Sequence, residues 1–173
     1  TAQTAALRST QLPTLITDQI VALNTAQVRA LSTAAVATLT SDQAAAMETQ
    51  DVAAMRTSQV QVLSTDAVAA LSTAQLSVLS SSAVAALTSS QLQALTTQQM
   101  SVLSVAGLST TAIVGLSTQQ IVAMGTSGIA AMTTAQIAVL TTAQAQALLT
   151  DQIVALNTQQ AYVLSTSAIA ALT

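Results

Sequence analysis

The sequence contains no cysteine, histidine or lysine, and its single aromatic residue is Tyr162. Without an imidazole, a thiol or an amine, nucleophilic and acid–base catalysis would have to rely on carboxylates and hydroxyls alone. The absence of cysteine also excludes disulfides and thiolate metal sites within this chain. We therefore expect that the chain is not an enzyme, and we predict no catalytic residue, no cofactor and no metal ligand.

Formal charge is almost as scarce: three arginines stand against six acidic residues, and residues 67–150 carry no charge. Without a basic patch the chain cannot neutralise phosphates, so we predict no nucleic-acid partner. Hydroxyl residues interrupt every apolar stretch well before the roughly 18 residues that a membrane span requires, so we predict no membrane insertion. So little charge also gives little repulsion between copies, which favours self-association.

What the sequence has in abundance is an eight-residue repeat. Leucine or methionine recurs every eight residues from Leu7 to Leu103 and again from Leu116 to Leu172. When this residue is numbered position 8, the consensus is [S/T]-T-x-Q-[V/I]-x-A-L. We interpret residues 1–173 as a single octad-repeat solenoid and a piece of a longer protein. It has a first array over 1–103, a five-residue phase break over 104–108 and a second array over 109–173.

One continuous helix cannot accommodate this repeat, because eight residues at about 100° each carry the apolar stripe about 80° beyond two turns. A Ser/Thr pair every eight residues suits helix boundaries instead. The pattern predicts one short helix per octad, over positions 3 to 8, with the hydroxyl of position 2 as the N-cap. The predicted structural N-caps are Thr17, Thr25, Thr33, Thr65, Thr73, Thr118, Thr134, Thr142 and Thr158.

Two other positions support this register. Position 3, in the predicted first turn, holds four aspartates, where the helix dipole favours negative charge. These are Asp18, Asp42, Asp66 and Asp151. Position 1 holds Asn24, Gly125 and Asn157, and we expect these residues to close the preceding helix in a left-handed or turn conformation.

Positions 5 and 8 lie three residues apart on one face of each predicted helix, so we predict that they form the core. The core leucines include Leu23, Leu31, Leu71, Leu79, Leu87, Leu140, Leu156 and Leu164. Two-turn helices are unstable alone, so stability must come from stacking of repeats. The 24-residue spacing of Asp18, Asp42 and Asp66 predicts three octads per coil.

The predicted fold is therefore an all-α solenoid of very short helices, one per octad, wound as triangular coils of 24 residues. A β-solenoid is the alternative, because threonine, valine and isoleucine favour strands. The abundance of alanine argues against it. So does the odd spacing of positions 5 and 8, which would place the two apolar residues on opposite faces of a strand.

The closest set of acidic residues, Asp42, Glu48 and Asp51, invites interpretation as a cation site. We favour a structural interpretation, with Asp42 at a helix start and with Glu48 and Asp51 on a solvated face beside Arg56. Hard cations need several converging oxygens, and the sequence contains no calcium-loop signature. Tyr162, at position 6, is predicted to point outward.

Tandem units such as Ser72-Thr-Ala-Gln-Leu-Ser-Val-Leu79 resemble the octapeptide-repeat arrays of very large, secreted bacterial surface proteins of the adhesin type. The resemblance spans the chain apart from residues 104–108. It implies export, display at the cell surface and a role as a spacer, stalk or adhesive surface, with neighbouring repeats or domains of the parent protein as partners. It carries over no functional residue. The alternatives are a binding module that presents a regular Ser/Thr face to ice, a glycan or a protein, and a repeat that self-assembles end to end.

Overall fold

The computed structural model describes residues 7–164, and this part of the chain is helical without strands. Its α-helices are four to seven residues long, and two 3-10 helices accompany them. The elements are η1 (Leu12–Thr14), α2 (Thr17–Val21), α3 (Thr25–Ala30), α4 (Thr33–Val36), α5 (Ser41–Ala46), α6 (Thr49–Ala54), α7 (Thr57–Gln61), α8 (Thr65–Ala69), α9 (Thr73–Ser77), α10 (Ser81–Ala86), α11 (Ser89–Gln93), α12 (Thr97–Met100), η2 (Val105–Gly107), α13 (Thr110–Gly115), α14 (Thr118–Ala123), α15 (Gly125–Ala131), α16 (Thr134–Ala138), α17 (Thr142–Gln146), α18 (Thr150–Val154) and α19 (Thr158–Val163). The prediction of one short helix per octad is confirmed, and the β-solenoid alternative is wrong for these residues.

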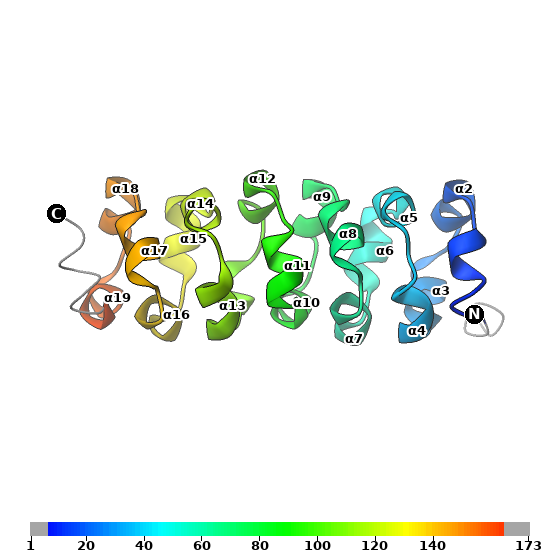
Figure 1. The fold of residues 1–173 in the computed structure, drawn as a ribbon, viewed down its shortest axis with the longest axis horizontal. Helices are drawn as coiled ribbons and strands as arrows, with labels where there is room; N and C mark the ends of the chain where they lie inside the picture. The colour runs from blue at the N-terminus through cyan, green and yellow to red at the C-terminus, as the bar shows by residue number, and fades with distance from the viewer. Residues whose placement is uncertain (1–6, 165–173) are drawn as a thin grey trace.

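The elements wind into an elongated rod with α2 near one end and α19 at the other (Figure 1). From α2 onward each element packs against the one three places later, so the elements form three columns along the rod. One column runs α4, α7, α10, η2, α15 and α18; the second runs α2, α5, α8, α11, α13, α16 and α19; the third runs α3, α6, α9, α12, α14 and α17. The predicted coil of three octads is therefore confirmed.

Apart from α15, each α-helix begins one residue earlier in the octad than predicted. Position 1 is the N-cap of these helices and has an extended backbone; where it is Ser, Thr or Asn, its side-chain oxygen accepts a hydrogen bond from the position-4 amide, as Ser72 does from Gln75 at 3.2 Å. The predicted N-caps are thus wrong by one residue, because a capping oxygen must precede the first helical residue to reach the third amide. The first residues of their helices are Thr17, Thr25, Thr33, Thr65, Thr73, Thr118, Thr134, Thr142 and Thr158.

This register changes the role of the position-1 residues. Asn24 and Asn157 are extended N-caps that accept hydrogen bonds from the amides of Gln27 and Gln160, so the helix-closing role predicted for them is wrong. Gly125 does adopt the predicted left-handed conformation, with φ of 66°, where it turns the chain from α14 into α15. The position-3 aspartates lie in the first turn as predicted: Asp18, Asp42, Asp66 and Asp151.

The two neighbouring threonines at the start of α17, its N-cap Thr141 and its first residue Thr142, provide a test of the cap register. Thr141 Oγ1 accepts a hydrogen bond from the Gln144 amide at 3.2 Å, whereas Thr142 is the exposed first residue of the helix. We expect Thr141→Ala to lower the free energy of unfolding by about 1 kcal/mol, because an N-cap is lost. Thr142→Ala should change it by less than about 0.5 kcal/mol, as exposed substitutions usually do. Urea unfolding followed by circular dichroism measures both, and equal losses would contradict the register.

The core lies along the rod axis and is filled from positions 5 and 8, as predicted. Six of the predicted core leucines are at most 8% exposed: Leu31, Leu71, Leu79, Leu87, Leu140 and Leu164. Leu23 and Leu156 are only half-buried and pack at the edge of this core. They belong to the first and last coils of the described rod, where stacking covers one side only.

The five-residue unit at 104–108 forms one whole side of a coil. Its 3-10 turn, η2, packs between α10 and α15, so the stack continues through the phase break. A Cβ atom on Gly107 would lie 2.7 Å from the carbonyl oxygen of Ser81, which leaves room for glycine alone at that point. The unit therefore shortens one side of the triangle and leaves the columns intact.

Candidate functional site

The most regular polar feature of the interior is the glutamine at position 4. Gln91 is 2% exposed, and its Oε1 accepts a hydrogen bond from the N–H of Thr88, the N-cap of its own helix, at 2.7 Å. Its Nε2 donates to the carbonyl oxygens of Val60 at 3.0 Å and Leu63 at 2.7 Å, in the coil below. One side chain thus closes a capping box within its helix and ties that helix to the preceding coil.

This arrangement, which we call the glutamine clamp, recurs in ten octads. The members are Gln43, Gln59, Gln75, Gln91, Gln99, Gln120, Gln136, Gln144, Gln152 and Gln160, all at most 7% exposed. Nine of them donate to the position-8 carbonyl four repeat units earlier, at 2.7–3.0 Å. The exception, Gln152, donates to Ile121 and Val122, where Gly125 alters the corner below it.

The clamps meet the strictest requirement of a buried amide, which is to have both its oxygen and its nitrogen in hydrogen bonds. Each net hydrogen bond contributes roughly 1 kcal/mol, so a clamp that makes three bonds contributes several kcal/mol to the junction between coils. The sequence signals were the glutamine at position 4 and the Ser/Thr-x-x-Gln spacing of a capping box. That spacing would have located the N-caps correctly.

Octad 48–55 has an aspartate in the clamp position. Asp51 is 1% exposed, and neither of its carboxylate oxygens has a hydrogen-bond partner among the described residues. Burial, and next the negative charge of Glu48, raise the pKa of Asp51 above its ordinary value. The prediction that Asp51 lies on a solvated face is wrong, because position 4 points into the rod; Glu48 is exposed as predicted.

No group among the described residues donates a hydrogen bond to the carboxylate of Asp51. From the geometry of the glutamine clamps we infer that its side chain is directed toward the carbonyls of Ile20 and Leu23, the counterparts of Val60 and Leu63. The guanidinium groups of Arg29 and Arg56 donate to backbone carbonyls instead. The ionised carboxylate would therefore face other acceptors, and a proton on Asp51 would supply the missing donor.

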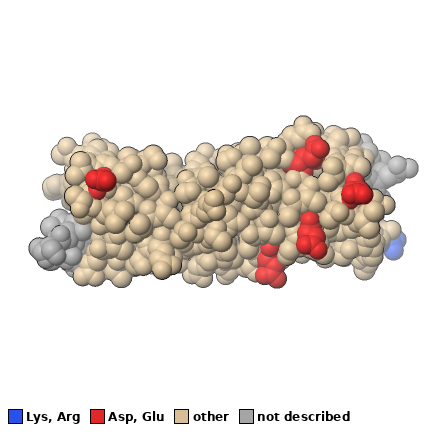
Figure 2. All heavy atoms as spheres, turned by 90° about the horizontal axis from the view of Figure 1, so that it is seen from above, with Lys and Arg blue, Asp and Glu red and all other residues tan. Residues whose placement is uncertain are grey.

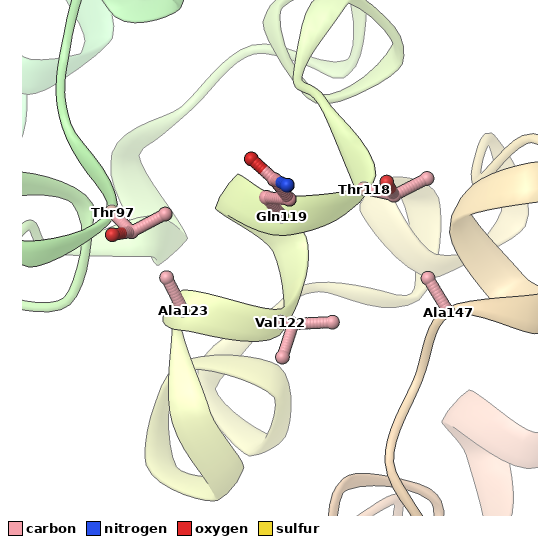
Figure 3. A pocket seen from close by; sticks show the side chains of 6 residues that line it. All are labelled: Thr97, Thr118, Gln119, Val122, Ala123 and Ala147. Atoms are coloured by element: carbon pink, nitrogen blue, oxygen red, sulfur yellow. The ribbon is translucent and has the colours of Figure 1, made fainter.

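The outer surface of the rod is formed by positions 1, 2, 3 and 6, with shallow grooves between coils. One groove of about 320 Å³ crosses the third column and is lined by Thr97, Thr118, Gln119, Val122, Ala123 and Ala147, from α12, α14 and the end of α17 (Figure 3). A second groove, of about 470 Å³, is lined by residues at the same octad positions, namely 2, 3, 6 and 7. One of them is Tyr162, which is 89% exposed as predicted. Position-2 threonines line the rims of both grooves. Their hydroxyls are free to face outward because position 1, and not position 2, caps the helices.

A family description for the ALTTAQ repeat matches residues 14–47, 44–81, 105–134 and 122–158, which together span most of the chain. The chain belongs to the ALTTAQ repeat family. In this chain the corresponding stretch is seen in Ala70-Leu-Ser-Thr-Ala-Gln75, which covers positions 7, 8, 1, 2, 3 and 4. An ALTTAQ unit therefore runs across a corner of the triangle, from the core leucine through the N-cap to the clamp glutamine.

No curated protein and no solved structure matches this ALTTAQ array. Within residues 7–164, no three histidine, cysteine, aspartate or glutamate side chains gather where they could hold a metal ion. None of the helices in that range is long and apolar enough to cross a membrane. The clamps and the outward hydroxyls are thus the regular polar features of the array.

Proposed function

We propose that the chain is a non-catalytic structural segment that acts as a spacer or stalk in a larger extracellular bacterial protein. The observation that carries the proposal is the clamp, which ties each coil to its neighbour by the same contacts along the rod. In a solenoid of this kind each coil contacts only adjacent coils, so length grows by a fixed increment per coil. Regular growth in length is what a spacer requires.

The charge distribution supports the same role. In the view of Figure 2, acidic side chains are spread over the right-hand part of the rod and recur toward its left end, and the face between them is uncharged. Packing and neutral hydrogen bonds are not screened by salt, whereas surface ion pairs are. A rod held together in this way keeps its length across a wide range of ionic strength. The export and surface display that we propose rest on the resemblance to adhesin-type octapeptide arrays.

An adhesive role through a Ser/Thr face is the second candidate, and one observation favours it. Position 1 caps the helices, so the position-2 threonines face outward and recur at every coil; Thr118 and Thr134 edge the two grooves. A hydroxyl row of this kind presents donors and acceptors at a regular spacing to a partner. Its test is binding of the intact chain to ice, glycan arrays or surface proteins, abolished when outward threonines of one column are replaced by lysine.

The spacer role predicts how length depends on repeat number. Duplicating residues 64–87, which span one coil with α8, α9 and α10, should lengthen the rod by about 9 Å, the usual distance between packed helix axes, and a second duplication by the same again. Small-angle scattering at low and high salt measures the maximum dimension. The matched control inserts residues 64–75, which are not a whole number of octads, and should lower stability. A maximum dimension that does not grow with added coils would refute the spacer role.

A further inference from the structure

Octad 48–55 buries an acidic group at position 4, where other octads carry glutamine, alanine or glycine. Asp51 is 1% exposed, and its two oxygens are the only buried side-chain polar atoms without a partner among residues 7–164. Where position 4 is alanine, as at Ala67, the carbonyls of the coil below also have no side-chain donor within the described range, so unpaired carbonyls alone indicate no ligand. A buried carboxylate is different, because it costs much free energy until an opposite charge or a donor reaches it.

The carboxylate of Asp51 stops short of the contacts that a clamp makes. In the next octad of the chain, Gln59 Nε2 lies 3.0 Å from the carbonyl oxygen of Leu31. Aspartate is one methylene group shorter than glutamine, which withdraws its oxygens by roughly 1.5 Å, the length of a C–C bond. By this comparison the oxygens of Asp51 lie about 4 Å from the carbonyl oxygens of Ile20 and Leu23. Oxygens at that separation can share one calcium ion, because each calcium–oxygen bond is about 2.3–2.6 Å long.

The polar groups that converge on this point are oxygen atoms, which are the donors that hard cations prefer. Glu48, three residues earlier, adds a negative charge that acts on Asp51. The guanidinium groups of Arg29 and Arg56 do not neutralise the two carboxylates, because they donate to backbone carbonyls at 3.2 Å and 2.9 Å. Helix α6 packs between α3 and α9, and α9 carries no charged residue. A cation from solution therefore meets negative charge that the chain itself leaves uncompensated.

We propose that Asp51 and the carbonyl oxygens of Ile20 and Leu23 bind one calcium ion, which joins octad 48–55 to octad 16–23 as a clamp nitrogen would. Calcium accepts irregular sets of about six to eight oxygens, so water completes its shell, whereas magnesium requires a tight octahedron. The site uses one carboxylate with backbone oxygens and requires no cluster of acidic side chains; Asp42 is exposed and takes no part. The expectation that the chain has no metal ligand is revised for Asp51 alone. This inference goes beyond the spacer role and does not depend on it.

Calorimetric titration of the intact chain with calcium chloride at neutral pH, after a chelator has removed metals, tests the site directly. We expect one ion per chain and, with a single buried carboxylate, a dissociation constant on the order of 0.1–1 mM. The midpoint of thermal unfolding should rise with calcium concentration above that value, because the ion binds the folded state. Magnesium should bind at least about tenfold more weakly. No binding up to about 10 mM calcium, or equal stabilisation by magnesium, would overturn the proposal.

Three variants assign the binding to Asp51. In Asp51→Gln the amide nitrogen takes the place proposed for the ion, so this chain should remain helical and its unfolding midpoint should not respond to calcium. Asp51→Asn keeps the size of the side chain but removes its charge, and its dissociation constant for calcium should rise at least about tenfold. The matched control, Asp66→Asn, removes the charge of an exposed aspartate in the first turn of α8 and should bind calcium like the parent chain. Calcium binding that survives in Asp51→Gln, or that is lost in Asp66→Asn, would contradict the assignment.

Hydrogen exchange locates the ion along the rod. Calcium should slow exchange in α2 and α6, whose octads supply the ligands, and should leave α16 to α19 unchanged, because each coil depends on its immediate neighbours. Calcium should also narrow the difference in unfolding midpoint between the parent chain and Asp51→Gln, since either the ion or the amide then joins the two octads. Protection centred on Asp151, an exposed aspartate in the first turn of α18, would show binding to surface carboxylates and would overturn the proposal.

Discussion

Replacing Asp51 by glutamine is expected to raise the free energy of unfolding by about 3 kcal/mol at neutral pH, because it removes an unpaired buried carboxylate and adds hydrogen bonds. Glutamine occupies the equivalent position in ten other octads, with its oxygen on the N-cap amide and its nitrogen on carbonyls of the coil below. The substitution should therefore restore the clamp between octad 48–55 and octad 16–23. Urea or thermal unfolding of the two chains at pH 7 measures the gain.

The difference in unfolding free energy between the parent chain and Asp51→Gln should also depend on pH. Burial and Glu48 raise the pKa of Asp51 in the folded chain, so the folded state holds its proton to higher pH than the unfolded state. The contribution of Asp51 to stability is therefore fully present below the unfolded pKa of about 3.9 and is lost as pH rises through the folded pKa. The difference in unfolding free energy between Asp51→Gln and the parent chain should grow over that window and then level off.

The variant Asp51→Asn separates the effect of removing the charge from the effect of lengthening the side chain. Asparagine has the size of aspartate and no charge, but it lacks the methylene group that carries the glutamine amide to the coil below. We expect it to remove the pH-dependent difference and to recover only part of the stability. If the parent chain and Asp51→Gln were equally stable at every pH, the carboxylate would have to be paired or hydrated, contrary to its isolation here.

The sequence predicted the repeating architecture because each octad carries its own local signals. Leucine at position 8 and a β-branched or other apolar residue at position 5 indicated the inner face. The aspartates at position 3 indicated the first turn, and their spacing from Asp18 to Asp66 indicated three octads per coil. These features depend on helix geometry within a few residues, so they can be predicted from the sequence alone.

The clamp could not be predicted in the same way. Gln91 donates to carbonyls 28 and 31 residues earlier, and those atoms come within reach only through the angle and rise of the coil. The burial of Asp51 was missed for the same reason: the sequence analysis placed Asp51 with Glu48 on a solvated face, and only the packing of the coils shows that position 4 points inward. The N-caps were predicted one residue too late for a local reason. Positions 1 and 2 both carry hydroxyls that could cap the helix, and the capping-box glutamine at position 4, three residues after position 1, identifies position 1 as the N-cap.

Removing a single interior clamp is expected to weaken the middle of the rod selectively. Gln91→Ala deletes four hydrogen bonds, leaving the Thr88 amide and the carbonyls of Val60 and Leu63 short of partners. Buried groups that lose a partner without access to water destabilise strongly, so we expect a loss of about 3 kcal/mol. The matched control is Gln98→Ala, an exposed position-3 residue, for which we expect less than about 0.5 kcal/mol.

Gln91→Glu turns the interior clamp into a counterpart of Asp51 and so tests the physical account of both. The glutamate can still accept from the Thr88 amide but, once ionised, it faces the Val60 and Leu63 carbonyls without a donor. Its stability should match that of the parent chain most closely in acid and fall as pH rises, which Gln91→Ala should not do. Hydrogen exchange should show the loss in the coils of α7 and α11 first, because each coil depends on its immediate neighbours. A loss spread evenly from α2 to α19 would mean that the rod unfolds as a single unit and that the clamps do not act locally.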